Sequence, residues 1–273
     1  MCRHIAYLGP TVTLGRLLSD PEHSLVRQSW APRHQHHGTV NADGFGIGWY
    51  AEGDPVPARY RRAGPIWGDL AFADLARVVR SGAVLAAVRD ATRAGADGEA
   101  AAAPFAEGPW LFSHNGSVRD WPDAAAPVAA SLAPQELLSL AARTDSALLW
   151  ALVLHRLRKG DALGAALAAP VRELAEAAPG SRLNLLLTDG RTIAATAWGD
   201  SLWYLADAAA QRTVVASEPY DDDPRWTEVP DRTLLTATRT RIELFSLKEP
   251  PQDAKGHLKE TSTSAPHQGD EGP

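Results

Sequence analysis

The stretch LNLLLTDGRTIAATAW, residues 183–198, marks the point where the chain changes from helical to strand patterning. Its two apolar runs, Leu183–Thr188 and Thr192–Trp198, flank Asp189-Gly190, a dipeptide typical of tight hairpin turns. The stretch therefore predicts two strands joined by a short turn. It also separates two kinds of pattern, because the segments just before it have helical spacing and the segments after it have strand patterning.

Two helices are predicted before this hairpin, at 137–157 and 161–178, where apolar residues recur at close to helical spacing and Gly or Pro-Gly follows. A short helix is predicted at 14–18 and a polar loop at 28–43. Apolar runs that end at turn or polar residues predict further strands at 2–8 (ending at Gly9-Pro10), 44–50, 84–89, 110–114, 202–205, 213–216 and 241–247. The order of strands, helices and strands predicts layered α+β packing rather than alternating βαβ units.

Composition limits the classes of function. A chain of 273 residues with 45% apolar residues can bury a large core, and a net charge of −6 gives no basic surface for nucleic acid or an anionic membrane. One cysteine excludes an internal disulfide, and the chain shows neither a signal peptide pattern nor a membrane-spanning run, so the cytoplasm is expected. After residue 247 the composition becomes polar and rich in Pro and Gly, which predicts a domain over 1–247 and a disordered tail over 248–273.

Cys2 is the single cysteine, and it follows the initiator methionine. Removal of Met1 would place a thiol and a free α-amine on the same residue. A thiol with a reference pKa of about 8.5 and an α-amine that titrates near about 8 form a nucleophile and base pair without a histidine. Alone, a cysteine at this position is more simply incidental, so its meaning depends on a substrate site elsewhere in the chain.

Three predicted elements begin or end in polar residues that could form such a site. Arg89 lies at the end of a predicted buried strand, where it could pair with a protein carboxylate or bind an anionic ligand. Asn115-Gly116 offers two N–H donors to an oxyanion, although a plain β-turn explains it too. Thr144-Asp145 lies within the predicted helical segment 137–157, where either residue could cap a helix, or Asp145 could hold an ammonium group.

Together these fragments supply a cation for a carboxylate, an anion for an ammonium group and two N–H donors for an oxyanion, near a thiol nucleophile. This set of groups suits a glutamyl substrate whose side-chain amide is attacked by the thiol. The ordered set resembles the class II glutamine amidotransferases of the N-terminal-nucleophile hydrolase superfamily in five fragments: Cys2, Asn41–Tyr50, Arg89-Asp90-Ala91-Thr92, His114-Asn115-Gly116 and Thr144-Asp145-Ser146. The resemblance spans roughly residues 2–220.

The resemblance implies a four-layer αββα sandwich and a role for each matching residue. Cys2 would be the nucleophile with its own α-amine as general base, and Asn115 and Gly116 would form the oxyanion hole. The substrate α-carboxylate would be held by Arg89 and Thr92, and its α-ammonium by Asp145. The family implies a small-molecule γ-glutamyl substrate and no metal or organic cofactor. The sequence does not predict an oligomeric state.

Departures from the common family pattern narrow the prediction. Ala87 and Ala103-Pro104-Phe105 stand where many relatives have histidine and His-Pro-Phe. Together with these alanines, the opening Cys2-Arg3-His4, the segment Gln28–Arg33 and the segment Ser217–Pro224 resemble family members that hydrolyse a γ-glutamyl conjugate. No acceptor domain follows the predicted core, which favours a stand-alone γ-glutamyl amidohydrolase. A glutaminase subunit that feeds ammonia to a separate synthase is the alternative, followed by a binding protein without catalysis.

Two further clusters have competing interpretations. Tyr220, Trp226 or Trp30, with Asp221–Asp223, could line a pocket for a leaving group that carries a trimethylammonium, or they could be core aromatics and a solvated turn. The cluster His34-Gln35-His36-His37 could bind zinc, but no cysteine or acidic ligand accompanies it at suitable spacing. A loop beside the substrate entrance is the preferred interpretation, and no metal is predicted.

Overall fold

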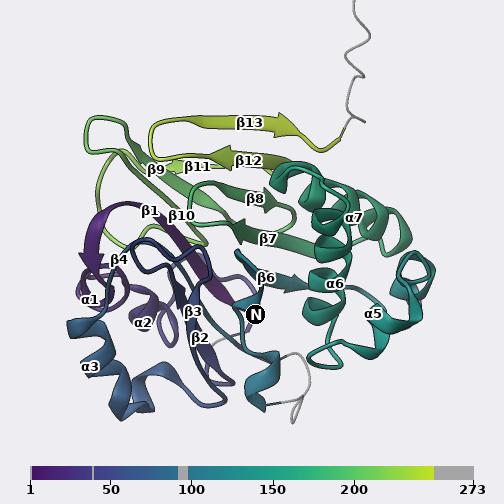
Figure 1. Cartoon of the computed structure of the whole chain (residues 1–273), viewed down its shortest axis with the longest axis horizontal. Helices are drawn as coiled ribbons and strands as arrows, with labels where there is room; N and C mark the ends of the chain where they lie inside the picture. The colour runs from purple at the N-terminus through teal and green to yellow at the C-terminus, as the bar shows by residue number, and fades with distance from the viewer. Residues whose placement is uncertain (1, 39, 92–97, 249–273) are drawn as a thin grey trace, which may run out of the picture.

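A computed structural model describes residues 2–38, 40–91 and 98–248, and it folds them into two antiparallel sheets stacked between layers of helices (Figure 1). The first sheet has the strand order β11 (Thr227–Glu228), β9 (Trp203–Asp207), β10 (Arg212–Ala216), β1 (Arg3–Thr13), β4 (Arg80–Val88), β2 (Phe45–Trp49) and β3 (Ala58–Arg62). The second has the order β13 (Ile242–Ser246), β12 (Thr233–Ala237), β8 (Ile193–Ala197), β7 (Arg182–Thr188), β6 (Trp110–Ser117) and β5 (Phe105–Glu107).

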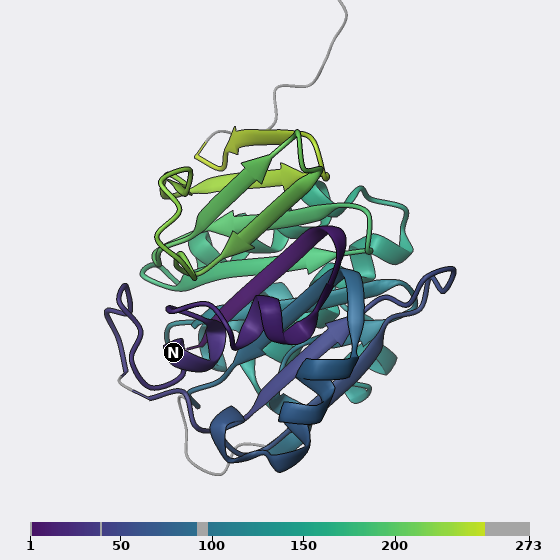
Figure 2. The same ribbon diagram turned by 90° about the vertical axis from the view of Figure 1, so that its left-hand side faces the viewer.

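The helices fall into two groups on opposite sides of the sheets. On the outer side of the first sheet lie α1 (Leu14–Leu18), α2 (Leu25–Gln28) and α3 (Leu70–Val78). The other group contains α4 (Ala126–Ala129), α5 (Pro134–Leu138), α6 (Asp145–Arg158) and α7 (Leu163–Ala177), of which α6 and α7 cover the second sheet. Short 3₁₀ turns are η1 (Ile66–Gly68), η2 (Gly98–Ala101) and η3 (Asp123–Ala125). Figure 2 looks onto the first sheet, with β1 in purple between the green β10 and the blue β4.

Three apolar cores hold these layers together, and β1 contributes to two of them. Ile5 and Tyr7 pack in the core between the first sheet and its helices. Ala6 and Leu8 pack in the core between the two sheets, because successive side chains of a strand point to opposite faces. A third core lies between the second sheet and α6 and α7. The predicted four-layer αββα sandwich is thereby confirmed.

The first strand is longer than predicted. It continues through Gly9-Pro10 to Thr13, with a shift of register against β4 between Leu8 and Val12. Strand β10 pairs with β1 only as far as Leu8, so the later part of β1 has β4 as its single described neighbour. Proline is tolerated there because an edge position does not require its missing N–H.

The helix predicted over 137–157 is two helices instead of one. α5 ends at Leu138, and α6 begins at Asp145 after the N-cap Thr144, whose side-chain oxygen accepts a hydrogen bond from the Ala147 backbone N–H at 3.2 Å. Apolar spacing continues across the break, so periodicity alone does not reveal it. The break matters because it creates a helix N-terminus at Asp145.

Within the described residues, no helix combines the length and apolar character that crossing a bilayer requires. The predicted tail lies outside the described residues except for Lys248, so the boundary after residue 247 stays a prediction.

Candidate active site

The start of β1 lies across the sandwich from β6. Arg3 pairs with Val88 in the register of β1 and β4, so the preceding residue, Cys2, lies beside Arg89 at the end of β4. His4 lies between the sheets, where its Nδ1 is 3.2 Å from the Ser113 Oγ of β6. Two strands of different sheets therefore bring residues 2 and 115, far apart in sequence, to the same end of the sandwich.

Cys2 opens into a cavity of about 420 Å³ where β1, β4, β6 and the start of α6 converge. Among its lining residues are four of the predicted site residues: Cys2, Arg89, Gly116 and Asp145. The others are Asp90, Ser117, Val118, Asp120, Trp121, Arg143, Thr144 and Ser146. Asn115 lies directly before Gly116 and is fully buried. Thr92, predicted to hold the substrate carboxylate, lies outside the described residues.

The Asp145 carboxylate is oriented by backbone donors at the N-terminus of α6. Its Oδ2 accepts a hydrogen bond from the Val118 N–H at 2.9 Å, and its Oδ1 accepts one from the Ser146 N–H at 2.7 Å. Thr144, not Asp145, caps the helix. Since an ionised carboxylate has about four lone-pair sites, both oxygens can still accept a hydrogen bond from a ligand ammonium.

The turn that carries Arg89 is fastened to the segment before β2. The Arg89 N–H donates to the Gly44 carbonyl at 2.8 Å, and the Asp43 N–H donates to the Arg89 carbonyl at 2.9 Å. The Asp43 carboxylate accepts a hydrogen bond from the Ala91 N–H at 2.8 Å. Asp43 thus positions the arginine turn, which gives a structural role to the Asn41–Tyr50 fragment recognised in the sequence.

Asn115 and Gly116 lie in β6 opposite Asn184 and Leu183 of β7. Strand β5 pairs only with Trp110–Phe112, so β7 is the one described strand neighbour of this end of β6. A Cβ atom at Gly116 would collide with the backbone carbonyl of Arg182. Glycine is therefore required at this position for the strand to pass so close to its neighbour.

Burial raises the pKa of the Cys2 thiol, because a low-dielectric surrounding disfavours the thiolate. A hydrogen bond from the Asp90 backbone and the positive charge of Arg89 act in the opposite direction, and the charge of Asp145 acts with burial. The resting sulfur is thus held as a thiol, and a nearby base is needed to remove its proton.

The buried imidazole of His4 is expected to make the stability of the fold depend on pH. Burial, followed by the charges of Arg3 and His114, lowers its pKa from 6.5 to about 3. As the pH falls below about 6.5, the unfolded chain binds a proton at His4 that the folded chain does not bind. The free energy of unfolding therefore decreases as the pH falls from about 6.5 to about 3, the pKa of His4 in the folded state. Between about pH 7.5 and pH 5.5 this histidine is expected to cost about 1.4 kcal/mol of unfolding free energy.

Urea unfolding at the two pH values tests this prediction. His4→Gln should flatten the pH dependence by about that amount, whatever its effect on absolute stability, because the titrating group is gone. His36→Gln, at an exposed histidine, is the matched control and should keep the wild-type slope. A His4→Gln variant with an unchanged slope would contradict the assignment.

The predicted leaving-group residues lie elsewhere. Tyr220 and Trp226 are buried together with ring centroids 5.3 Å apart, and the Trp226 indole donates to Asp221 Oδ1 at 2.7 Å. Tyr220 and Asp221 line a different cavity, of about 550 Å³, whose lining does not include Cys2. Trp30 packs edge-on against Trp67 with centroids 5.6 Å apart. The structure therefore supports the core interpretation of Tyr220 and Trp226.

The histidine-containing loop is fixed by Glu218. Its two carboxylate oxygens accept hydrogen bonds from the Arg33 and His34 backbone N–H groups at 3.0 and 2.8 Å. The ring of His34 lies 5.5 Å from that of Trp203, and the Gln35 amide oxygen accepts from Arg3 Nε at 3.1 Å. These contacts fasten the loop over the start of β1.

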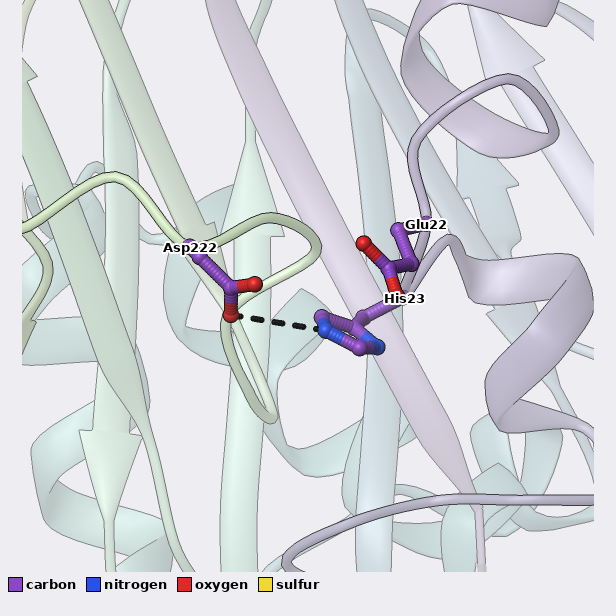
Figure 3. A group of neighbouring side chains, drawn as sticks. All are labelled: Glu22, His23 and Asp222. Atoms are coloured by element: carbon purple, nitrogen blue, oxygen red, sulfur yellow. Dashed lines mark ion pairs between the residues drawn. The ribbon is translucent and has the colours of Figure 1, made fainter.

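Across the part of the chain that the structure describes, one group of side chains has metal-ligand spacing, and it is Glu22, His23 and Asp222 rather than the histidine loop (Figure 3). His23 Nε2 lies 3.4 Å from Asp222 Oδ1, and Arg33 Nη1 lies 3.0 Å from the same oxygen. The guanidinium already supplies the positive charge that a cation would supply, so we interpret this group as a surface ion-pair cluster.

The two stacked antiparallel sheets between layers of helices agree with the αββα sandwich expected for an N-terminal-nucleophile hydrolase. A family model described as class II glutamine amidotransferases matches residues 20–211, and this chain belongs to that family. A solved structure of a class II glutamine aminotransferase domain protein from Silicibacter pomeroyi superposes with a TM-score of 0.64 at 26% identity, over 90% of this chain and 99% of the other.

Curated relatives are more similar in sequence. A protein of Mycolicibacterium smegmatis named gamma-glutamyl-hercynylcysteine sulfoxide hydrolase is 43% identical over 90% of this chain and 100% of its own length. A Mycobacterium tuberculosis protein of the same name is 41% identical over 90% of this chain and 97% of its own.

Proposed function

We propose that this protein hydrolyses the γ-glutamyl amide bond of γ-glutamyl hercynylcysteine sulfoxide in the cytoplasm, releasing glutamate and hercynylcysteine sulfoxide for ergothioneine biosynthesis. The observation that carries the proposal is the cavity that places the Cys2 thiol together with the Arg89 guanidinium and the Asp145 carboxylate. The names of the 41–43% identical relatives support this choice of leaving group.

The glutamyl end of the substrate is held by two charges. The planar fork of Arg89 binds the α-carboxylate, a geometry that guanidinium groups favour. The Asp145 carboxylate, oriented by the Val118 and Ser146 N–H groups, binds the α-ammonium. Thr92 is proposed as a further carboxylate ligand by family resemblance. With the α end fixed, the side-chain amide extends toward Cys2.

The first chemical step is acyl transfer to sulfur. We propose that Met1 is removed, so that the α-amine of Cys2 takes the proton of its own thiol. The sulfur attacks the γ-carbonyl carbon, and the resulting oxyanion accepts hydrogen bonds from the Asn115 side chain and the Gly116 N–H. The protonated amine then gives its proton to the departing nitrogen, the C–N bond breaks, and a γ-glutamyl thioester on Cys2 remains.

Water completes the cycle. The neutral amine accepts a proton from a water molecule that attacks the thioester carbonyl, and the same oxyanion site stabilises the second tetrahedral intermediate. Collapse breaks the C–S bond, returns the proton to sulfur and releases glutamate. Because the resting thiol has a raised pKa, this scheme assigns its deprotonation to the adjacent amine rather than to spontaneous ionisation.

The proposed function is tested by comparing γ-glutamyl hercynylcysteine sulfoxide with glutamine as substrates for the purified protein. We expect kcat/KM for the conjugate to exceed that for glutamine by at least about 100-fold, since glutamine lacks the leaving-group contacts. Efficient glutamine hydrolysis with no preference for the conjugate would favour a glutaminase subunit. Turnover of neither substrate would overturn the proposal.

Arg89→Lys predicts a selective loss of substrate binding. Lysine keeps the charge but loses the bidentate fork, so KM for the conjugate should rise about 10- to 100-fold while kcat changes by less than about threefold. Steady-state kinetics measures both constants. Arg77→Lys, at an exposed arginine paired with Asp74, is the matched control and should behave as wild type. An unchanged KM would show that the α-carboxylate is held by another group.

A further inference from the structure

A single buried hydroxyl joins the strand that carries the nucleophile to the strand that carries the oxyanion-hole amide. Ser217 Oγ accepts a hydrogen bond from the His4 backbone N–H at 3.0 Å and another from Asn115 Nδ2 at 3.4 Å. Ser217, His4 and Asn115 are all fully excluded from solvent. Water therefore cannot replace either interaction at no cost.

The hydroxyl itself is held rigidly in the first sheet. Ser217 follows β10 directly and extends its pairing with β1, because the Ser217 N–H donates to the His4 carbonyl at 3.0 Å. The Ser217 carbonyl accepts a hydrogen bond from Ser201 Oγ at 2.8 Å. The Ser217 backbone is thus fixed to His4, two residues after Cys2 in the first sheet. Asn115 belongs to the second sheet, so the Ser217 hydroxyl connects the two sheets.

We propose that Ser217 is a positioning residue, which sets the orientation of the Asn115 amide relative to the Cys2 sulfur. An amide nitrogen carries two hydrogens. The Ser217 oxygen binds one of them, which fixes the plane of the amide and directs the second hydrogen toward a fixed point. Because donors in an oxyanion hole act through preorganisation, an amide free to rotate about its side-chain torsions stabilises the transition state less well.

The proposal rests on the proposed function, since it concerns stabilisation of the same oxyanion. It assigns Ser217 an effect on kcat and none on binding of the glutamyl α end, which Arg89 and Asp145 hold. Among the described residues, neither Arg89 nor Asp145 forms a hydrogen bond with Ser217. The proposal thus gives a role to Ser217, the first residue of the Ser217–Pro224 segment whose resemblance was noted in the sequence.

Ser217→Ala should lower kcat for the γ-glutamyl conjugate about tenfold with KM unchanged within about twofold. Ser113→Ala is the matched control, because Ser113 is equally buried, lies in the same strand as Asn115 and bonds His4 Nδ1 instead of the amide. Both variants lose a buried hydroxyl and should lose thermal stability, but Ser113→Ala should keep its kcat. Ser217→Cys fills the same space with a weaker acceptor, and it decides the question if Ser217→Ala does not fold.

A double variant separates positioning from general damage. If Ser217 acts through Asn115, adding Ser217→Ala to Asn115→Ala should change kcat by less than about twofold, because the amide to be positioned is already absent. The inference would be overturned if Ser217→Ala lowered kcat another tenfold in the Asn115→Ala background. It would also be overturned if Ser217→Ala and Ser113→Ala lost the same amount of kcat. An active wild type with normal kcat in Ser217→Ala overturns this inference alone, whereas an inactive wild type overturns the proposed function.

Discussion

Cys2→Ala is expected to lower turnover of γ-glutamyl hercynylcysteine sulfoxide by about 10⁴-fold or more, because it removes the atom that forms the covalent intermediate. Alanine is also small, so removal of Met1 should proceed and the α-amine should remain in place. The amine alone can serve as a base but offers no comparable nucleophile. Initial-rate measurement of glutamate release gives the loss directly.

Retained binding shows that the loss is chemical. Cys2→Ala should bind glutamate with wild-type affinity by calorimetry, since Arg89 and Asp145 are untouched. Cys2→Ser should leave only a small residual rate, because a hydroxyl is much harder to deprotonate than a thiol. Wild-type turnover in Cys2→Ala would refute the proposed mechanism.

Asn115→Ala should lower kcat about 10²- to 10³-fold with little change in KM, since removal of one oxyanion-hole donor acts on the transition state and spares the bound substrate. The Gly116 N–H remains and should support the residual rate. Steady-state kinetics on the conjugate measures the two constants separately.

Asn184→Ala is the matched control for this variant. Asn184 lies opposite Asn115 in β7, is equally buried, and donates its amide to the carbonyls of Asp200 and Ser201 at 2.9 and 3.1 Å. Its loss should reduce thermal stability while kcat stays within about threefold of wild type. If Asn115→Ala lost no more activity than Asn184→Ala, the oxyanion would have to be stabilised by other groups.

The fold was predictable where local signals and packing agree. The hairpin around Asp189-Gly190 and the strand over 44–50 appear as β7–β8 and β2 because turn residues and apolar runs define them locally. The two glycines of β2 allow a close approach of the facing layer, since a Cβ at Gly46 or Gly48 would meet Ala103, Pro104 or Leu111.

Other elements carried weaker signals or were overridden by tertiary context. β3 is a polar edge strand, ARYRR, without the alternation that marks a half-buried strand. α3 carries a start signal in its sequence, because Asp69 precedes its apolar run and caps the helix by accepting hydrogen bonds from the Ala71 and Phe72 N–H groups at 2.9 Å.

The candidate site was predictable as a set of residue types but not as a network. Cys2, Arg89, Gly116 and Asp145 line one cavity, as the family resemblance led us to expect. The bond between Ser217 and Asn115 crosses from one sheet to the other over 102 sequence positions, and no local pattern encodes such a contact. Tyr220 and Trp226 belong to the core outside the first sheet rather than to the lining of the Cys2 cavity, and aromatic composition does not say on which face of a sheet a ring is buried.

The central claim, that the sulfur and the amine of one residue carry out both steps, is tested most directly by mass spectrometry of the N-terminal peptide from the wild-type protein, acid-quenched during turnover of the γ-glutamyl conjugate. The account predicts a peptide that begins at Cys2, lacks Met1 and carries one γ-glutamyl group on sulfur in a fraction of the molecules. A fully active protein that retains Met1, or a glutamyl group attached to a different residue, would contradict it.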